Sequence, residues 1–256
     1  MVMSTDLERR IGLQIKSELE TKQGVVYLED RWVVEYVQGI AARVIDIAKL
    51  ERPDVQWHVM IINDRKIVNA FATPGGFLFV YRGLLEAVDD EAELAGVMAH
   101  EAGHVVGRHA ARQMVAAYGL DAVSRLALGR NAGLLERLGA KIGAKGLLLA
   151  HSRDEESEAD EFGARYAAAA DYDPQGIVRF FDWLVRHERS AGALREYLSD
   201  HPASADRIEQ VSAYIAEHSY TGEATNQQDY ASMKRYLVTL PAGRPAPPRT
   251  WHGPTR

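Results

Sequence analysis

The chain of 256 residues contains no cysteine. This absence excludes disulfides, cysteine nucleophiles and thiolate metal ligands. Any metal ion in this protein would therefore be held by His, Asp or Glu. The compartment stays open, because a cysteine-free chain suits both the cytoplasm and the periplasm.

The chain also lacks a cluster of basic residues. It has 30 Lys and Arg against 36 Asp and Glu, with a net charge of −6 and a pI near 5.9. Nucleic-acid binding needs basic residues gathered on one surface. We therefore expect no nucleic-acid partner.

Long hydrophobic runs are missing as well. The longest candidate, residues 67–81, is too short to span a bilayer and is broken by Pro74, Gly75 and Gly76. The first residues, "MVMSTDLERR", lack the apolar core and small-residue cleavage site of a signal peptide. Because a signal could have been removed, this start leaves the localisation open.

Helical and strand patterns divide the chain into an α+β arrangement that is mostly helical. Residues 5–19 and 30–50 have apolar residues at helical spacing, and three β-rich runs separated by turns predict a small antiparallel sheet of three or more strands. Helical patterns then dominate, with Asp89 or Asp90 as the expected N-cap of the first long helix. The expected strands are 55–62, 67–72 and 77–83. Packed helices are expected over 114–149, with further helices over 153–170, from 173 onward, and over 202–218 as the last clear helix.

The most informative stretch is "HEAGH", a His-Glu-x-x-His pattern at residues 100–104. On a helix, His100 and His104 lie on one face and can share a metal ion. Glu101 can then reach a water molecule on that ion without binding the ion itself. This is the arrangement that metal-assisted hydrolysis needs, but a catalytic zinc site requires a third protein ligand.

His109 is the nearest candidate for that ligand, and the spacing argues against it. One class of zinc peptidases has a third histidine six residues after the second, with a glycine between them. Gly107 fits this extension, but the required position holds Ala110. His109 is one residue early, which is about 100° of helical rotation. We therefore expect an exposed or supporting histidine rather than a ligand.

Glu156 and Asp160 are better candidates, in the stretch "HSRDEESEADEFGARYAA". They are four residues apart and project from one helix face. Glu156 can complete a His-His-Glu set, and Asp160 can accept a hydrogen bond from the far nitrogen of a ligating histidine. The alternative is an ordinary acidic helix start favoured by the helix dipole. The incomplete two-histidine site favours the metal interpretation.

"HEAGH" followed by "SRDEESEAD" and preceded by "NAFATPGGFLFVYRGLL" resembles the zinc metallopeptidase family of the HtpX, BepA and Oma-type quality-control proteases, which includes the CAAX prenyl endopeptidase. The resemblance covers residues 57–207. It implies a gluzincin-type domain, one zinc ion per chain, and Glu156 rather than Glu158 as the third ligand, with Asp160 closing the motif. We expect one domain over residues 1–240, with helices over 1–50, the sheet and catalytic helices over 51–218, and a loose proline-rich tail over 241–256.

The resemblance adds further candidate residues. "SDHPASADRIEQ" places His201 and Arg207 at the active site, where either could stabilise an oxyanion, or His201 could close the zinc site as a fourth ligand. In the alternative interpretation neither residue has a functional role: His201 ends a loop before Pro202, and Arg207 faces solvent. The strand "FLFVY", with Phe77 and Phe79, is expected at the cleft edge, where it could pair with an extended substrate. Asn69 and Ala70 would lie near the cleft, although all four residues also suit a plain hairpin.

The expected function is zinc-dependent hydrolysis of internal peptide bonds in extended or misfolded proteins. The resemblance implies envelope quality control, with membrane-associated proteins among the substrates. Because it lacks transmembrane helices, the chain resembles the soluble, exported bacterial branch more than the membrane-embedded branches, which favours the periplasm or cell envelope over the cytoplasm. The alternative is a chaperone-like assembly factor with a structural or latched zinc site. A small-molecule metallohydrolase has no support in the sequence, and the oligomeric state stays open.

Overall fold

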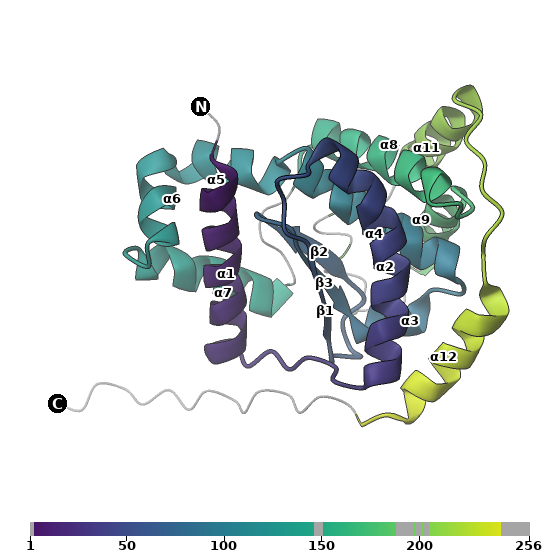
Figure 1. Ribbon diagram of the computed structural model, residues 1–256, viewed down its shortest axis with the longest axis horizontal. Helices are drawn as coiled ribbons and strands as arrows, with labels where there is room; N and C mark the ends of the chain where they lie inside the picture. Colours follow the sequence, from purple (N-terminus) through teal and green to yellow (C-terminus); the bar gives the residue numbers. More distant parts are fainter. Residues whose placement is uncertain (1–2, 146–150, 188–196, 198–200, 202–204, 242–256) are drawn as a thin grey trace.

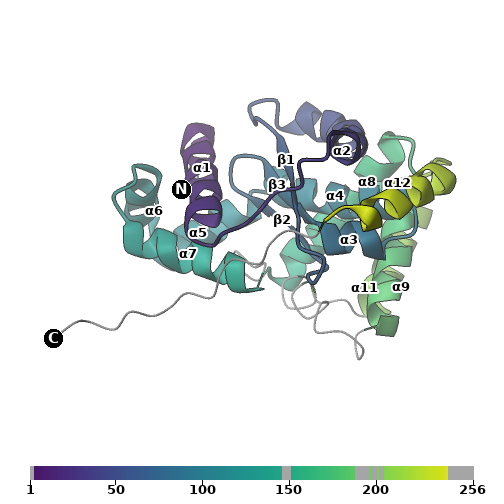
Figure 2. The ribbon, with the colours of Figure 1, turned by 90° about the horizontal axis from the view of Figure 1, so that it is seen from below.

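A three-stranded sheet stands between two groups of helices (Figures 1 and 2). The computed structural model describes residues 3–145, 151–187, 197, 201 and 205–241. One group contains α1 (Thr5–Thr21), α5 (His109–Tyr118), α6 (Leu120–Ala127) and α7 (Ala132–Lys145). The other contains α2 (Arg31–Glu51), α3 (Arg82–Ala87), α4 (Glu91–Val106), α8 (Arg153–Ala169), α9 (Gly176–His187), α11 (Ala205–Glu217) and α12 (Gln227–Thr239).

The sheet is mixed, which corrects the expectation of an antiparallel sheet. Its order is β1 (His58–Ile62), β3 (Phe77–Tyr81), β2 (Ala70–Thr73), with β1 parallel and β2 antiparallel to β3. The segment after Asn63 does not close a hairpin between β1 and β2. It passes the end of β3, where the Gly83 N–H at the start of α3 donates to the Asp64 carbonyl, and β2 pairs on the far side of β3.

Strand β3 separates two parts of the core. Its side chains are all buried, and they alternate between the two faces as a strand requires. Phe77, Phe79 and Tyr81 pack with α1, α5, α6 and α7, while Val80 packs with α2, α4, α8 and α9. The central strand is therefore covered on both faces.

Helices α4 and α8 pack more closely on each other than any other described pair. Helix α4 begins after Asp90, whose side chain accepts a hydrogen bond from the Glu93 N–H, so Asp90 is the N-cap. At Gly103, an added Cβ would lie 2.7 Å from the Phe162 Cβ and 3.2 Å from the Ala159 carbonyl oxygen. A side chain there would push α8 away. The missing Cβ thus brings the α8 carboxylates up to the α4 histidines.

Most of the expected helices are present, with ends shifted by a few residues. The prediction missed α12, which lies beyond the expected last helix. Its buried residues Tyr230, Met233 and Leu237 have helical spacing, so the pattern could have been read from the sequence. Pro202 and the tail from residue 242 onward lie outside the described residues. Within the described part of the chain, no helix has both the length and the apolar character needed to cross a bilayer.

Candidate metal centre

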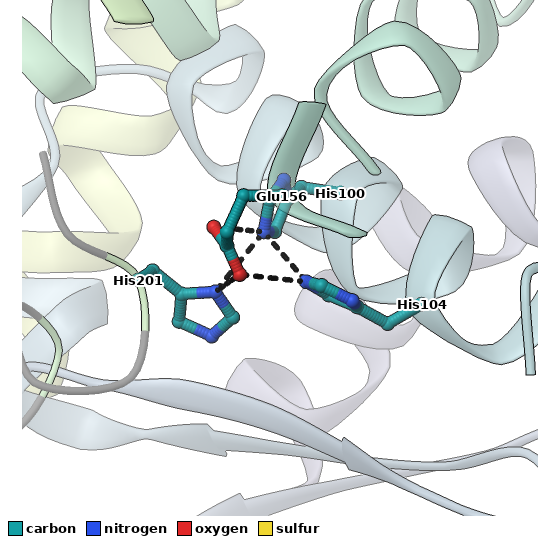
Figure 3. A group of neighbouring side chains, drawn as sticks. All are labelled: His100, His104, Glu156 and His201. Carbon is teal, nitrogen blue, oxygen red and sulfur yellow. Dashed lines mark hydrogen bonds and ion pairs between the residues drawn. The ribbon is translucent and has the colours of Figure 1, made fainter. Parts of the chain in front are cut away.

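Four side chains from three parts of the chain point toward one another (Figure 3). His100 and His104 come from α4, Glu156 comes from the first turn of α8, and His201 lies before α11. Each side chain offers one ligand atom within 4.8 Å of the other three, and all four residues are buried. The structure therefore brings together the His-Glu-x-x-His histidines, the downstream glutamate and the histidine near the C-terminus.

The spacing of these donor atoms fits a tetrahedral zinc ion. Zinc bonds of roughly 2.0–2.1 Å place the ligand atoms about 3.3–3.4 Å from one another. The His100 and His104 Nε2 atoms are 3.0 Å apart, and His104 Nε2 lies 3.4 Å from Glu156 Oε1. His201 Nδ1 lies 3.2 Å from His100 Nε2 and 2.8 Å from Glu156 Oε1. The residues present therefore fit one ion in the centre of the group.

The protonation of the two α4 histidines suits metal binding. Burial lowers the pKa of His100, although Asp160 and Glu156 partly oppose this effect. Burial also lowers the pKa of His104 well below its usual value, and the neighbouring His151 adds to the shift. Both rings are therefore neutral at physiological pH. A neutral imidazole has the free lone pair that a metal ligand needs.

Asp160 and Arg207 form a buried ion pair behind His100. Asp160 Oδ1 lies 2.9 Å from His100 Nδ1, the ring nitrogen that faces away from the other donors. The Arg207 guanidinium donates to both Asp160 oxygens at 2.6 and 2.7 Å. It also lies 2.9 Å from Glu156 Oε2 and sits over the Phe181 ring. Arg207 thus holds two carboxylates in place.

Glu101 and His201 lie together at the side of the group. Glu101 Oε1 is 3.4 Å from His201 Nε2. Burial by itself lowers the pKa of His201, but Glu156 and Glu101 outweigh it and raise the pKa to about 9. A protonated His201 donates a hydrogen bond to Glu156, forms an ion pair with Glu101 and cannot bind a cation. The same ring can therefore be a donor to carboxylates or, after losing a proton, a ligand.

Two more histidines lie against His104. His109 is not in the four-donor group, because its Nδ1 lies 2.7 Å from the outer nitrogen of His104. It is fully buried, which excludes the exposed position that the sequence left open. Sequence reasoning missed His151, whose ring stacks on His104 at a centroid distance of 3.8 Å. Only its place directly before the Ser152 N-cap of α8 could have suggested it.

The strand that we expected to bind substrate, residues 77–81, does not lie at an edge of the sheet. Residues 77–81 form β3, which is paired on both sides, so the expectation of an edge strand there is wrong. Phe77 and Phe79 are buried against α1, and Asn69 and Ala70 are fully buried as well. Among the described strands, β2 is the edge strand near the histidines, and its residues Ala72 and Thr73 line a small cavity together with His104. The physical reason is the crossing connection that puts β3 in the centre.

The fold and the donor set define a metallohydrolase site of the gluzincin type, with His-Glu-x-x-His on one helix and a glutamate on another. The profile of peptidase family M48 matches residues 30–215, and the chain belongs to this family.

Several curated relatives match most of the chain. The mitochondrial metalloendopeptidase OMA1 of Schizosaccharomyces pombe is 29% identical over 88% of this chain and 66% of its own length. The beta-barrel assembly-enhancing protease of Yersinia pestis is 27% identical over 93% of this chain and 50% of its own. Metalloprotease YcaL of Escherichia coli strain K12 is 33% identical over 63% of each. The chain thus spans about half to two thirds of the length of these relatives.

Proposed function

We propose that this protein is a zinc-dependent endopeptidase. The observation that carries the proposal is the buried group of His100, His104 and Glu156, spaced for one zinc ion and flanked by Glu101. The names of the relatives as a metalloendopeptidase and as proteases support the same activity. His100, His104 and Glu156 would hold the ion.

The roles of the side chains follow from their positions. A bound zinc ion would supply a Lewis acid that polarises the peptide carbonyl and lowers the pKa of water. Glu101 follows the first ligand on α4 and would accept the proton of the attacking water, then deliver it to the departing amine. Asp160 would keep the proton of His100 on Nδ1, so that Nε2 stays free. Arg207 would fix the orientation of Glu156.

The edge of β2 suits an extended substrate backbone. The Tyr81 N–H donates to the Asn69 carbonyl, so the alternation of an antiparallel pair turns the backbone of Ala72 away from β3. Among the described strands none pairs with β2 on that side. A peptide added there would be held through its backbone, with little demand on its side chains. This is the binding mode that an unfolded segment can use and a folded protein cannot.

A cavity of about 500 Å³ opens beside Glu156 and could receive substrate side chains. Its described lining is polar and carries both signs of charge, with Arg153, Asp154 and Asp206 at its walls. Such a lining favours no single charge. We infer a broad specificity, consistent with the removal of misfolded proteins, including membrane-associated ones.

The cell envelope is the proposed setting. One relative is named as a mitochondrial metalloendopeptidase, and another is named as a protease that enhances β-barrel assembly. We extend this setting to the present chain as protein quality control in the envelope or periplasm.

A second function is favoured by the position of His201. Its Nδ1 lies among the other donor atoms, so it could close the zinc site with a fourth protein ligand. Four protein ligands are typical of structural zinc sites, and the protein would then act as a chaperone-like assembly factor. A latched peptidase, in which substrate displaces His201, combines both functions.

The test compares the wild type with Glu101→Gln and His201→Ala. Bound zinc is measured for each protein, together with cleavage of unfolded casein. We expect about one zinc ion per chain in all three proteins, and a loss of kcat/KM of about 10²–10⁴-fold in Glu101→Gln, as for removal of a general base. Glu161→Gln, an exposed acidic residue on α8, is the matched control.

The outcomes separate the functions. Higher activity of His201→Ala with unchanged zinc content would identify His201 as a latch. Zinc in all three proteins, without cleavage of any unfolded substrate, would favour the assembly factor. A wild type that binds no zinc would contradict both functions.

A further inference from the structure

We propose that His109 and Glu158 form a positioning relay that holds the ring of His104 in its zinc-binding tautomer. The inference rests on the proposed function, because it concerns a ligand of the proposed zinc ion. It gives His104 the same kind of support that Asp160 gives to His100, but through His109 and Glu158 in series.

The relay is a chain of two contacts that leads from the metal group to the surface. His104 Nδ1 lies 2.7 Å from His109 Nδ1, and His109 Nε2 lies 3.0 Å from Glu158 Oε2. The His104 and His109 side chains are buried, whereas the Glu158 side chain is 45% exposed. His109 therefore uses both ring nitrogens inside the protein, and its outer partner can exchange with water.

The backbone around residues 107–109 is built to place this ring. Helix α4 ends at Val106, and Arg108 adopts a left-handed conformation with φ of 58°, so α5 starts in a new direction at His109. Arg108 is held there by an ion pair with the buried Glu8 at 2.6 Å. A non-glycine residue pays a conformational cost for a positive φ, and the ion pair offsets part of it. The turn swings His109 behind His104.

Gly107 provides the space that the His109 ring occupies. An added Cβ at Gly107 would lie 2.4 Å from His109 Nε2 and 2.9 Å from its Cε1. No real Cβ makes such contacts, so any side chain at this position would displace the ring. The glycine is therefore a condition for the relay, although its own backbone is ordinary helix-end geometry.

The positions of the protons follow from the geometry. His104 Nε2 faces Glu156 and His100, so it must be unprotonated to bind an ion. The single proton of the neutral ring is then on Nδ1 and is donated to His109 Nδ1. His109 must carry its own proton on Nε2, which donates to Glu158. Without the relay, a neutral His104 can move its proton to Nε2, and this tautomer cannot bind zinc.

A competing interpretation is a second metal site. His104, His109 and His151 each offer a nitrogen within 4.8 Å of the others. For His104 to serve both sites, its ring would need to lose both protons and bridge two ions. A hydrogen bond between His104 and His109 needs no such deprotonation, and it uses the observed Nδ1–Nδ1 contact directly.

The test uses variants that differ in one hydrogen-bond group. His109→Phe keeps a ring but removes the acceptor, whereas His109→Asn restores an oxygen near the position of Nδ1. Glu158→Ala removes the end of the relay, and Glu161→Gln is the control on the same helix. The zinc dissociation constant of each is measured by competition with a chromophoric chelator. Circular dichroism verifies the fold, and nitrogen-15 NMR of the zinc-loaded protein reports the His104 ring.

We expect zinc to bind His109→Phe about 10–100-fold more weakly than the wild type, the usual cost of losing a hydrogen-bond partner of a metal ligand. His109→Asn should recover most of this loss. Glu158→Ala should lose less, because water can replace its exposed carboxylate. We expect the His104 Nδ1–H to exchange slowly in the wild type and rapidly in His109→Phe.

The outcomes distinguish this inference from the proposed function. If the wild type binds zinc and His109→Phe binds it as tightly, the relay is wrong while the peptidase site stands. The relay is also overturned if the wild type binds two zinc ions and His109→Phe only one, because the second site would then explain the contacts. Absence of zinc from the wild type contradicts the proposed function itself.

Discussion

The buried pair of Asp160 and Arg207 should affect stability and zinc binding through different contacts. Three variants separate the effects: Arg207→Met, Asp160→Leu and the double variant. With zinc removed by a chelator, Arg207→Met leaves Asp160 and Glu156 without their shared cation. We expect the free energy of unfolding to fall by about 3–5 kcal/mol, as for other buried pairs that lose one partner.

The size of this loss can be worked from the geometry. Opposite charges about 4 Å apart interact by roughly 4 kcal/mol at an effective dielectric constant of 20. The two hydrogen bonds of 2.6 and 2.7 Å and the nearly complete burial of both side chains support a value in that range. For a chain of this length, 1 kcal/mol shifts the Tm by about 2 °C. The expected fall in the Tm is therefore about 6–10 °C.

The double variant should be more stable than Arg207→Met alone. Removing both charges leaves Glu156 as the only carboxylate that has lost its guanidinium. We therefore expect a coupling energy of about 2 kcal/mol or more between Asp160 and Arg207, measured by urea unfolding. Zinc binding should not recover, because His100 has still lost the carboxylate at its Nδ1, and the affinity should stay about 10–100-fold weaker.

Either of two results would refute this reasoning. The first is additivity of the two single changes within about 0.5 kcal/mol, which is typical of residues that do not interact. The second is a double variant with the zinc affinity of the wild type, which would show that His100 needs no acceptor at Nδ1.

Three further changes test other parts of the structure. Gly107→Ala should weaken zinc binding about as much as His109→Phe, measured with the same chelator, because the new Cβ would occupy the place of the His109 ring. Arg82→Met should lower the free energy of unfolding by about 3 kcal/mol or more in urea, because the fully buried Arg82 donates to the carbonyls at the end of α12; a loss below about 1 kcal/mol would contradict this. Arg52 lowers the pKa of Asp54 to about 2, so this carboxylate stabilises the fold above about pH 4 and loses the effect as pH falls toward 2. Because Asp54 is 45% exposed, Asp54→Asn should cost at most about 1 kcal/mol at pH 7 and less at about pH 3, and an equal cost at both pH values would refute the assignment.

The helices that carry the metal group could be predicted because their signals are local. His100 and His104 are one helical turn apart, and so are Glu156 and Asp160, so each pair lies on one face wherever its helix packs. The Asp90 cap and the acidic first turn of α8 are also local. What these patterns leave open is the distance between α4 and α8. That distance depends on Gly103, whose meaning appears only when the second helix is in place.

The sheet shows where local signals fail. The runs at residues 58–62, 70–73 and 77–81 could be recognised as strands, but their order depends on the path of the connection from β1 to β2, which no strand pattern contains. Three short strands with turns between them predict a meander of hairpins. The observed crossing places β3 in the centre and transfers the free edge, and with it the proposed substrate contact, to β2.

The position of His109 depends on the tertiary structure as well as on local helical spacing. If α4 continued past Val106, helical rotation would place His109 away from the Nε2 side of His104, where the other donors lie, and this agrees with the structure. The rotation gives no information about the Nδ1 side, which His109 contacts. The chain reaches that face because α4 stops and Arg108 turns left-handed, and Glu8, a hundred residues earlier, helps to hold the turn. A supporting residue of this kind is specified by the tertiary structure rather than by its spacing from the ligand. Its partner Glu158 lies in the same short motif as Glu156 and Asp160. Two of these acidic residues of α8 contact the α4 histidines directly, and Glu158 reaches His104 through His109 of α5.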